Sequence, residues 1–331
     1  NINKNFKLRG TVRKNSLNRT YENIIPSEIE QSASQTGELA SYATGLTRSN
    51  EMNYEGLASY TSMFMNNKLN VNLNVGGNVL QTRYNDAESN TVQGLNVPGL
   101  YTISNSKANP TITNRRQGTE VRSVFGFGDI EWNRMIAVNF ALRNDWYSTL
   151  PAGDNSLLSP SVGASFFFSD LTKNALPWLS YGKLFASWGK KPLSLTVYQN
   201  NFAYTIGQNQ WNGNYLTTVP GAGITPGVTG ALITTYEAGF DFKFARNRFG
   251  LNFTYYDETS KNPPISVSTS AYSGFTSVLM NATEVRRKGI EIVADAKVFT
   301  TRDFEWTINK TFGYLIKNPI VELLPGQPRI L

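Results

Sequence analysis

The sequence predicts an all-β protein, namely part of an antiparallel transmembrane β-barrel, with about eleven strands counted from the alternation. Three observations lead to this fold class. Apolar and polar residues alternate with a period of two through much of the chain, which is typical of strands with one apolar and one polar face. Aromatic residues lie at the ends of the apolar runs, as in membrane strands. Short and long connections also alternate, as in outer-membrane barrels.

The clearest predicted hairpin spans Gly239–Tyr256. Its alternation stops at a polar turn, residues 245–248, and then resumes, as expected of two antiparallel strands joined by a tight connection. The opposite face carries charges and amides such as Asp241 and Asn252. The apolar positions are large and mostly aromatic: Phe240, Phe242, Phe244, Phe249, Leu251, Phe253 and Tyr255. A soluble sandwich with an aromatic core would give the same pattern, so this hairpin alone leaves core and lipid open.

The same alternation predicts further strands and hairpins at residues 6–13, 56–84, 121–147, 162–168, 184–188 and 289–314. In the first of these hairpins, Asn70, Asn72 and Asn74 alternate with aliphatic residues. Three amides in a dry core would each need buried partners, so this row favours a wet lumen. In the next hairpin, the apolar run 136–142 leads to Trp146, and a ring at the end of an apolar band is typical of a membrane strand.

Long polar stretches without a clear period separate the hairpins, and we expect them to be extracellular loops: about 14–53, 86–118, 148–159, 189–234 and 259–285. A soluble sandwich has no reason to gather its long loops at one end. An odd number of strands would leave two unpaired edges, whereas bacterial single-chain barrels have even numbers. We therefore expect residues 1–331 to be a portion of one barrel domain.

The composition excludes several classes of protein. Cysteine and histidine are both absent, which excludes disulfide scaffolds, Cys/His zinc sites and histidine-dependent nucleophilic catalysis. The net charge is +7, but the basic residues are scattered, so we do not expect nucleic-acid binding. No apolar run is long enough for a transmembrane helix, and Asn1–Asn5 is too polar to begin a signal peptide.

No motif indicates catalysis or cofactor binding. Acidic pairs such as Asp257 and Glu258 lie at strand ends, where solvated charges are common, and none resembles a glycosidase site. Gly126 and Gly128 form a G-x-G within a predicted strand and without a following helix, which indicates close packing and not a nucleotide site. We therefore expect no enzyme activity, no catalytic residues, no cofactor and no metal site.

Several short motifs occur together in a specific order and spacing. They are Arg143-Asn144-Asp145-Trp146-Tyr147, Ser159-Pro160-Ser161-Val162-Gly163, Phe185-Ala186-Ser187-Trp188-Gly189, Tyr236-Glu237-Ala238-Gly239 and Lys288-Gly289-Ile290-Glu291. As an ordered set they resemble the barrel of SusC/RagA-type TonB-dependent outer-membrane transporters of Bacteroidetes. The resemblance covers most of Leu57–Pro325.

The resemblance implies a 22-stranded barrel in the bacterial outer membrane, with an internal plug. We expect this chain to cover part of that barrel, without the plug or the C-terminal strands. The implied function is nutrient import: oligosaccharides or peptides enter, the TonB complex supplies energy through the plug, and a SusD-like surface lipoprotein acts as a lid. Outer-membrane lipid surrounds the barrel. The alternatives are a surface-exposed, β-rich glycan-binding protein without transport activity and a β-rich hydrolase.

The strongest ligand-binding hypothesis falls in the loop 189–234. Aromatic rings beside amides suit sugars or peptides, because a ring offers an apolar face and the amides offer hydrogen bonds. The residues concerned are Trp211, Tyr215, Asn209 and Asn212. The alternative is a loop that only packs on its neighbours or on the lid protein.

Overall fold

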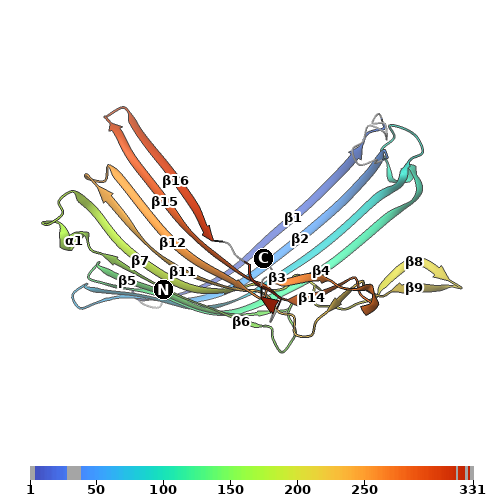
Figure 1. Cartoon of the computed structure of the whole chain (residues 1–331), viewed down its shortest axis with the longest axis horizontal. Coiled ribbons are helices and arrows are strands. Elements are labelled where there is room, and N and C mark those ends of the chain that lie inside the picture. The colour runs from blue at the N-terminus through green and yellow to red at the C-terminus, as the bar shows by residue number, and fades with distance from the viewer. Residues whose placement is uncertain (1–3, 28–38, 318–319, 325–326, 329–331) are drawn as a thin grey trace. The chain divides into compact units, whose positions relative to one another are not determined.

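The computed structural model describes residues 4–27, 39–317, 320–324 and 327–328 (Figure 1). It confirms the all-β class, since the described helical elements are short: η1 (Ile103–Asn105), α1 (Ser169–Thr172) and η2 (Ala271–Ser273). In the part of the chain that the structure describes, no helix has the length and apolar character needed to cross a membrane.

Most described residues belong to one large sheet. Its order is β1-β2-β3-β4-β5-β6-β7-β11-β12-β15-β17-β18, and β16 pairs with β15. The long strands are β1 (Phe6–Ile25), β2 (Ser41–Phe64), β3 (Leu69–Leu95), β4 (Ser106–Trp132), β5 (Ile136–Tyr147), β6 (Ser156–Phe167), β7 (Leu179–Pro192), β11 (Leu232–Phe244), β12 (Phe249–Lys261), β15 (Glu284–Thr300) and β16 (Glu305–Lys317). These agree with the prediction of about eleven strands. Two short strands follow, β17 (Ile320–Leu324) and β18 (Gln327–Pro328).

Five shorter strands lie in the connections between the long ones. β8 (Thr205–Trp211) pairs with β9 (Asn214–Thr218) as a separate hairpin. A second small sheet has the order β10-β14-β13 and combines two loops that are distant in sequence. Its strands are β10 (Ala222–Ile224), β13 (Pro264–Ser268) and β14 (Ser277–Asn281). The loops predicted at 189–234 and 259–285 therefore contain ordered β-structure.

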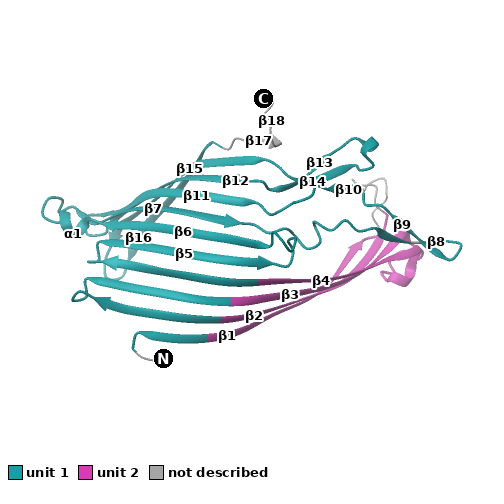
Figure 2. Cartoon of the chain, turned by 90° about the horizontal axis from the view of Figure 1, so that it is seen from below, with its two compact units in different colours: residues 1–9, 56–77, 122–331 teal, residues 10–55, 78–121 magenta. Residues whose placement is uncertain are grey.

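The chain forms two compact units (Figure 2). Unit 1 comprises residues 1–9, 56–77 and 122–331, and unit 2 comprises residues 10–55 and 78–121. Strands β1 to β4 contribute residues to both units. In unit 1 the strands β5, β6, β7, β11, β12 and β15 lie side by side in one sheet (Figure 2).

Unit 2 corrects the prediction of irregular loops at 14–53 and 86–118. β1 continues to Ile25, β2 begins at Ser41 and β3 and β4 cover most of the second stretch. The strands bear polar residues on both faces, so the period-two signal disappears although the backbone is extended. Side chains bond across strands instead: Thr47 Oγ1 donates to Asp86 Oδ1 at 2.8 Å. Tyr42 donates its hydroxyl proton to Glu22, and this hydrogen bond raises the pKa of Tyr42.

The short connections agree with the sequence prediction. Asn133 and Arg134 have φ of 53° and 57°, the left-handed values that a two-residue hairpin turn requires. Gly128 confirms the close packing expected of the G-x-G motif. A Cβ at this position would meet the carbonyl oxygen of Asn72 and approach Phe140 Cζ at 3.2 Å, so only glycine fits here without a shift of the neighbouring strand.

The described buried cluster lies among the connections of unit 1. Leu150, Leu195, Val228 and Leu279 pack together, and they come from three different connections. We call residues 148–155, 193–231 and 262–283 the loop assembly. Asn281 also holds it together: its Nδ2 donates to the carbonyls of Thr229 and Asn262, both at 2.8 Å. The loop assembly is therefore a packed structure with its own small core.

Candidate functional site

The strand registers of unit 1 give its sheet one apolar and one polar face. On one face, Leu184, Phe240, Phe253, Ile292 and Phe312 are successive partners across five neighbouring strands. The ring centroids of Phe240 and Phe253 lie 5.4 Å apart, and the two rings are stacked with an interplanar angle of 16°. We call this the apolar face. Its alternation is as predicted from residues 239–256.

The polar face lies one residue away along each strand. Lys183, Asp241 and Asn252 are successive partners across β7, β11 and β12. Lys183 lies over the ring of Phe185 at 5.1 Å and Lys243 over that of Tyr181 at 5.8 Å. Cations, acids and aromatic rings therefore share this face, which makes it suited to polar partners with apolar parts.

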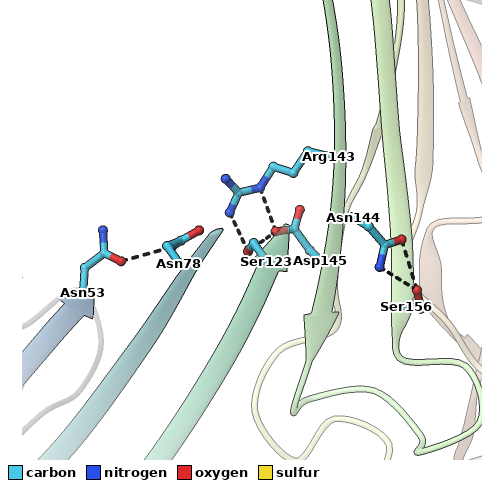
Figure 3. A network of polar contacts seen from close by, with 7 residues as sticks. All are labelled: Asn53, Asn78, Ser123, Arg143, Asn144, Asp145 and Ser156. Carbon is cyan, nitrogen blue, oxygen red and sulfur yellow. Dashed lines mark hydrogen bonds and ion pairs between the residues drawn. The ribbon is translucent and has the colours of Figure 1, made fainter. Parts of the chain in front are cut away.

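A buried polar network lies on the polar face, where the long-loop end of β5 meets the middle of β4 (Figure 3). Arg143 donates from Nε to Asp145 Oδ1 and from Nη2 to Ser123 Oγ, both at 2.7 Å. Ser123 donates to the same carboxylate oxygen. Ser123 and Asp145 are only 4% and 5% exposed, and the guanidinium also lies over the ring of Phe125 at 5.2 Å. Because each hydrogen bond is charge-assisted, the network holds Arg143 in one orientation.

The predicted row of asparagines lies on the polar face as well. Asn74 accepts a hydrogen bond from Ser59 Oγ at 2.6 Å, and Asn72 donates to Asp129 Oδ1 at 3.0 Å. These two amides thus find partners on neighbouring strands. Asn70 differs, since its buried Oδ1 has no hydrogen-bond partner among the described residues. A buried amide oxygen requires a donor, which water or another segment would have to supply.

The ligand-binding residues predicted in the loop lie on the β8–β9 hairpin. Asn212 and Gly213 form its turn with φ of 48° and 79°. Trp211 pairs with Asn214, and Tyr215 pairs with Gln210. Since cross-strand partners share a face, the register places the two rings on opposite faces of the hairpin. Trp211 and Tyr215 are 76% and 62% exposed.

Asn209 lies on β8, two residues before Trp211. The hairpin therefore brings these residues into one element, but it does not place both rings against one ligand face. Ligand binding by them stays a prediction.

Neither the Arg143 network nor Asn281 was predicted as a site from the sequence. The signal for the network was the spacing of Arg143 and Asp145, which is two residues on a strand and so places both on one face. Ser123 lies on another strand, and nothing in the local pattern joins it to them. Among the described residues no group of three acidic, cysteine or histidine side chains could hold a metal ion.

The profile of the family described as TonB dependent receptor-like, beta-barrel, matches residues 2–327. A TonB-dependent receptor, P3, of Formosa agariphila is 25% identical over 219 residues. That match covers 63% of this chain and 21% of the relative. This chain thus matches about a fifth of the length of that curated relative.

Solved structures share the fold. The RagAB peptide transporter aligns with a TM-score of 0.81 at 18% identity, covering 98% of this chain and 36% of that one. The siderophore receptor PiuA from Acinetobacter baumannii aligns with a TM-score of 0.60 at 12% identity, covering 97% and 46%. The ferric-catecholate import receptor Fiu from K12 E. coli gives 0.54 at 14% identity, again covering 97% and 46%. Each match extends over almost the whole of this chain and less than half of the other.

Proposed function

The chain belongs to the TonB-dependent receptor-like β-barrel family, whose barrels lie in the bacterial outer membrane, and from this premise we propose that it forms part of the wall of a nutrient importer. The cargo would be an oligosaccharide or a peptide that passes along the polar face. The observation that carries the proposal is the separation of the two faces: a continuous apolar row, Leu184 to Phe312, lies on one face of the sheet, and the polar network around Arg143 lies on the opposite face of the same sheet.

In this proposal the apolar face meets lipid and the polar face surrounds the lumen. The long-loop end would face the cell exterior, since outer-membrane barrels have short periplasmic turns and long outer loops. β3 and β4 have 27 residues each, whereas a tilted strand crosses the bilayer with about 10. Their unit 2 residues would therefore lie outside the hydrocarbon layer, which agrees with the polar side chains on both faces there.

The proposed partners are a SusD-like lipoprotein and the TonB complex. RagAB is described as a peptide transporter, and the fold shared with it supports a comparable arrangement here. The loop assembly would offer the lipoprotein a packed platform, because its strands and buried cluster join three connections. The matched relatives carry the names of receptors and transporters, and we propose that this protein is likewise not an enzyme.

A second candidate function is glycan binding at the surface without transport. The observation that favours it is the exposed hairpin with Trp211 and Tyr215, together with Asn209 and Asn212, which we propose as ligand-binding residues. Exposed rings on a projecting hairpin can stack on sugars without any passage through a barrel.

The two functions are separated by an uptake experiment in cells that carry the full-length protein. Fluorescent oligosaccharides and peptides are added, and surface-bound label is distinguished from internal label by protease or glycosidase treatment. Import predicts internal label that disappears when the gene is deleted or when a proton uncoupler removes the energy for TonB. Surface label alone, insensitive to the uncoupler, would favour the glycan-binding alternative.

A further inference from the structure

A row of cations lies on the apolar face just beyond its aromatic end, on the side of the long loops. Its members are Lys190 on β7, Lys261 on β12, and Arg286 and Lys288 on β15, and we call them the basic rim. None of the functions discussed above uses these residues.

The registers place the basic rim in three adjacent rows of the sheet, with Lys190 and Arg286 in the middle row. Lys190, Thr234, Thr259 and Arg286 are successive partners across β7, β11, β12 and β15. Three strand spacings of about 4.8 Å make this row roughly 14 Å long. These positions have the same parity as Phe240, so the cations project from the apolar face.

The adjacent row toward the middle of the strands is amphipathic. Trp188, Tyr236, Asp257 and Lys288 are successive partners there. Rings of this kind settle where hydrocarbon meets the headgroups. The basic rim therefore begins at the level where a bilayer presents its phosphate groups.

The basic rim has fewer carboxylates than cations among its described contacts. Asp257 accepts hydrogen bonds from Arg286 Nε at 2.8 Å and Nη2 at 2.6 Å, and Lys288 Nζ lies 3.0 Å from the same carboxylate. Lys261 pairs with Glu284 at 3.2 Å, and Lys190 lies over the ring of Trp188 at 5.8 Å. Among the side chains that the structure describes, four cations thus share two carboxylates, and this part of the rim keeps a net positive charge.

The polar face at the same level is different. Arg287, next to Arg286 in sequence, pairs with Glu258 alone at 3.2 Å, directly across the strands. This pair on the polar face has one cation and one acid, whereas on the apolar face two cations share Asp257. A purely stabilising ion-pair ladder would not need two cations on one carboxylate.

We propose that the basic rim binds the phosphate group of an anionic outer-membrane lipid, whose acyl chains lie along the apolar face. The proposal rests on the proposed contact of that face with lipid. Asp257 binds the Nε and Nη2 edge of the Arg286 guanidinium and so orients it, which leaves the edge at Nη1 to donate to a phosphate, and the lysines add point charges. A cation near an anionic membrane surface contributes about 1 kcal/mol, which is about a five-fold change in binding.

Neighbouring residues allow a matched test in the full-length protein. The variant K190Q/R286Q removes two cations from the apolar face, and the control K191Q/R287Q removes two from the polar face of the same two strands. All four side chains are exposed, and the two variants have equal net charge. Each detergent-solubilised protein is titrated with lipid A and with its dephosphorylated form, and native mass spectrometry counts the bound lipids.

The proposal expects K190Q/R286Q to bind lipid A roughly 25-fold more weakly than wild type, from two cations at about five-fold each, while K191Q/R287Q stays within two-fold. The wild-type protein should also bind the dephosphorylated lipid more weakly than lipid A, by about the same factor. Equal losses in both variants, or equal binding of both lipids, would overturn it. If millimolar inorganic phosphate displaced lipid A from the wild-type protein, the site would bind free phosphate, and the lipid assignment would be overturned. Because the titration involves no cargo, a failure of uptake would refute the proposed function and leave this result standing.

Discussion

Placing an arginine at Phe240 should destabilise the folded barrel strongly if the apolar face meets lipid. Phe240 lies in the middle of β11, stacked against Phe242 with centroids 4.4 Å apart and against Phe253 at 5.4 Å. An arginine on the lipid face near the bilayer midplane costs about 2–4 kcal/mol. Loss of the closest ring pair adds about 1 kcal/mol. We therefore expect Phe240→Arg to lower the free energy of unfolding by about 3–5 kcal/mol.

The measurement is reversible urea unfolding of the full-length protein in lipid vesicles, followed by tryptophan fluorescence. Phe244→Arg is a depth control, because Phe244 ends β11 and stacks on Trp178 at 5.6 Å, where the cost of a charge falls to about 0–1 kcal/mol. Asp241→Asn changes the adjacent position on the polar face and should have almost no effect on unfolding. If Asp241→Asn proved more harmful than Phe240→Arg, the assignment of lipid and lumen faces would be reversed.

Three further predictions concern the polar face and the loops. Arg143→Gln should lower the free energy of unfolding by about 3 kcal/mol, because it leaves the buried carboxylate of Asp145 without its cation. Asp145→Asn should cost less, since the guanidinium of Arg143 is 39% exposed. Chemical denaturation that ranks the two variants in the opposite order would contradict the role of the network. Asn281→Ala removes three hydrogen bonds to backbone groups and should speed proteolysis within the loop assembly at least several-fold without lowering the unfolding midpoint of the barrel; unchanged cleavage would show that the loop assembly does not depend on it. If the hairpin binds cargo, only one of Trp211→Ala and Tyr215→Ala should weaken binding measured by calorimetry, because the rings lie on opposite faces; equal losses would require both rings to contact the ligand.

The fold class could be predicted because one face of most strands has to be apolar. Residues 240–244 and 249–255 alternate strictly, and the registers confirm that Phe240 and Phe253 share a face. The turns at Asn133 and at residues 245–248 were also evident, since a tight connection between two alternating runs leaves few other conformations.

Unit 2 could not be predicted in the same way. Residues such as Ser16, Asn50 and Thr47 give no alternation, because neither face of their strands is apolar. The strands form through backbone pairing and through side-chain bonds such as Ser16 Oγ to Asn50 Oδ1 at 2.9 Å. These partners lie 34 residues apart, a separation that a local pattern does not detect.

The two faces of the sheet, the tight turns and the family could thus be predicted from the sequence alone, because alternation and short motifs are local properties. The tertiary structure decided which strands stand side by side and in what register. That register brings Ser123 to Arg143, separates the rings of Trp211 and Tyr215, and aligns Lys190 with Arg286. The first and the last of these relations depend on hydrogen bonding between segments distant in sequence, and all three depend on register, because a shift of one residue would move every side chain of a strand to the opposite face.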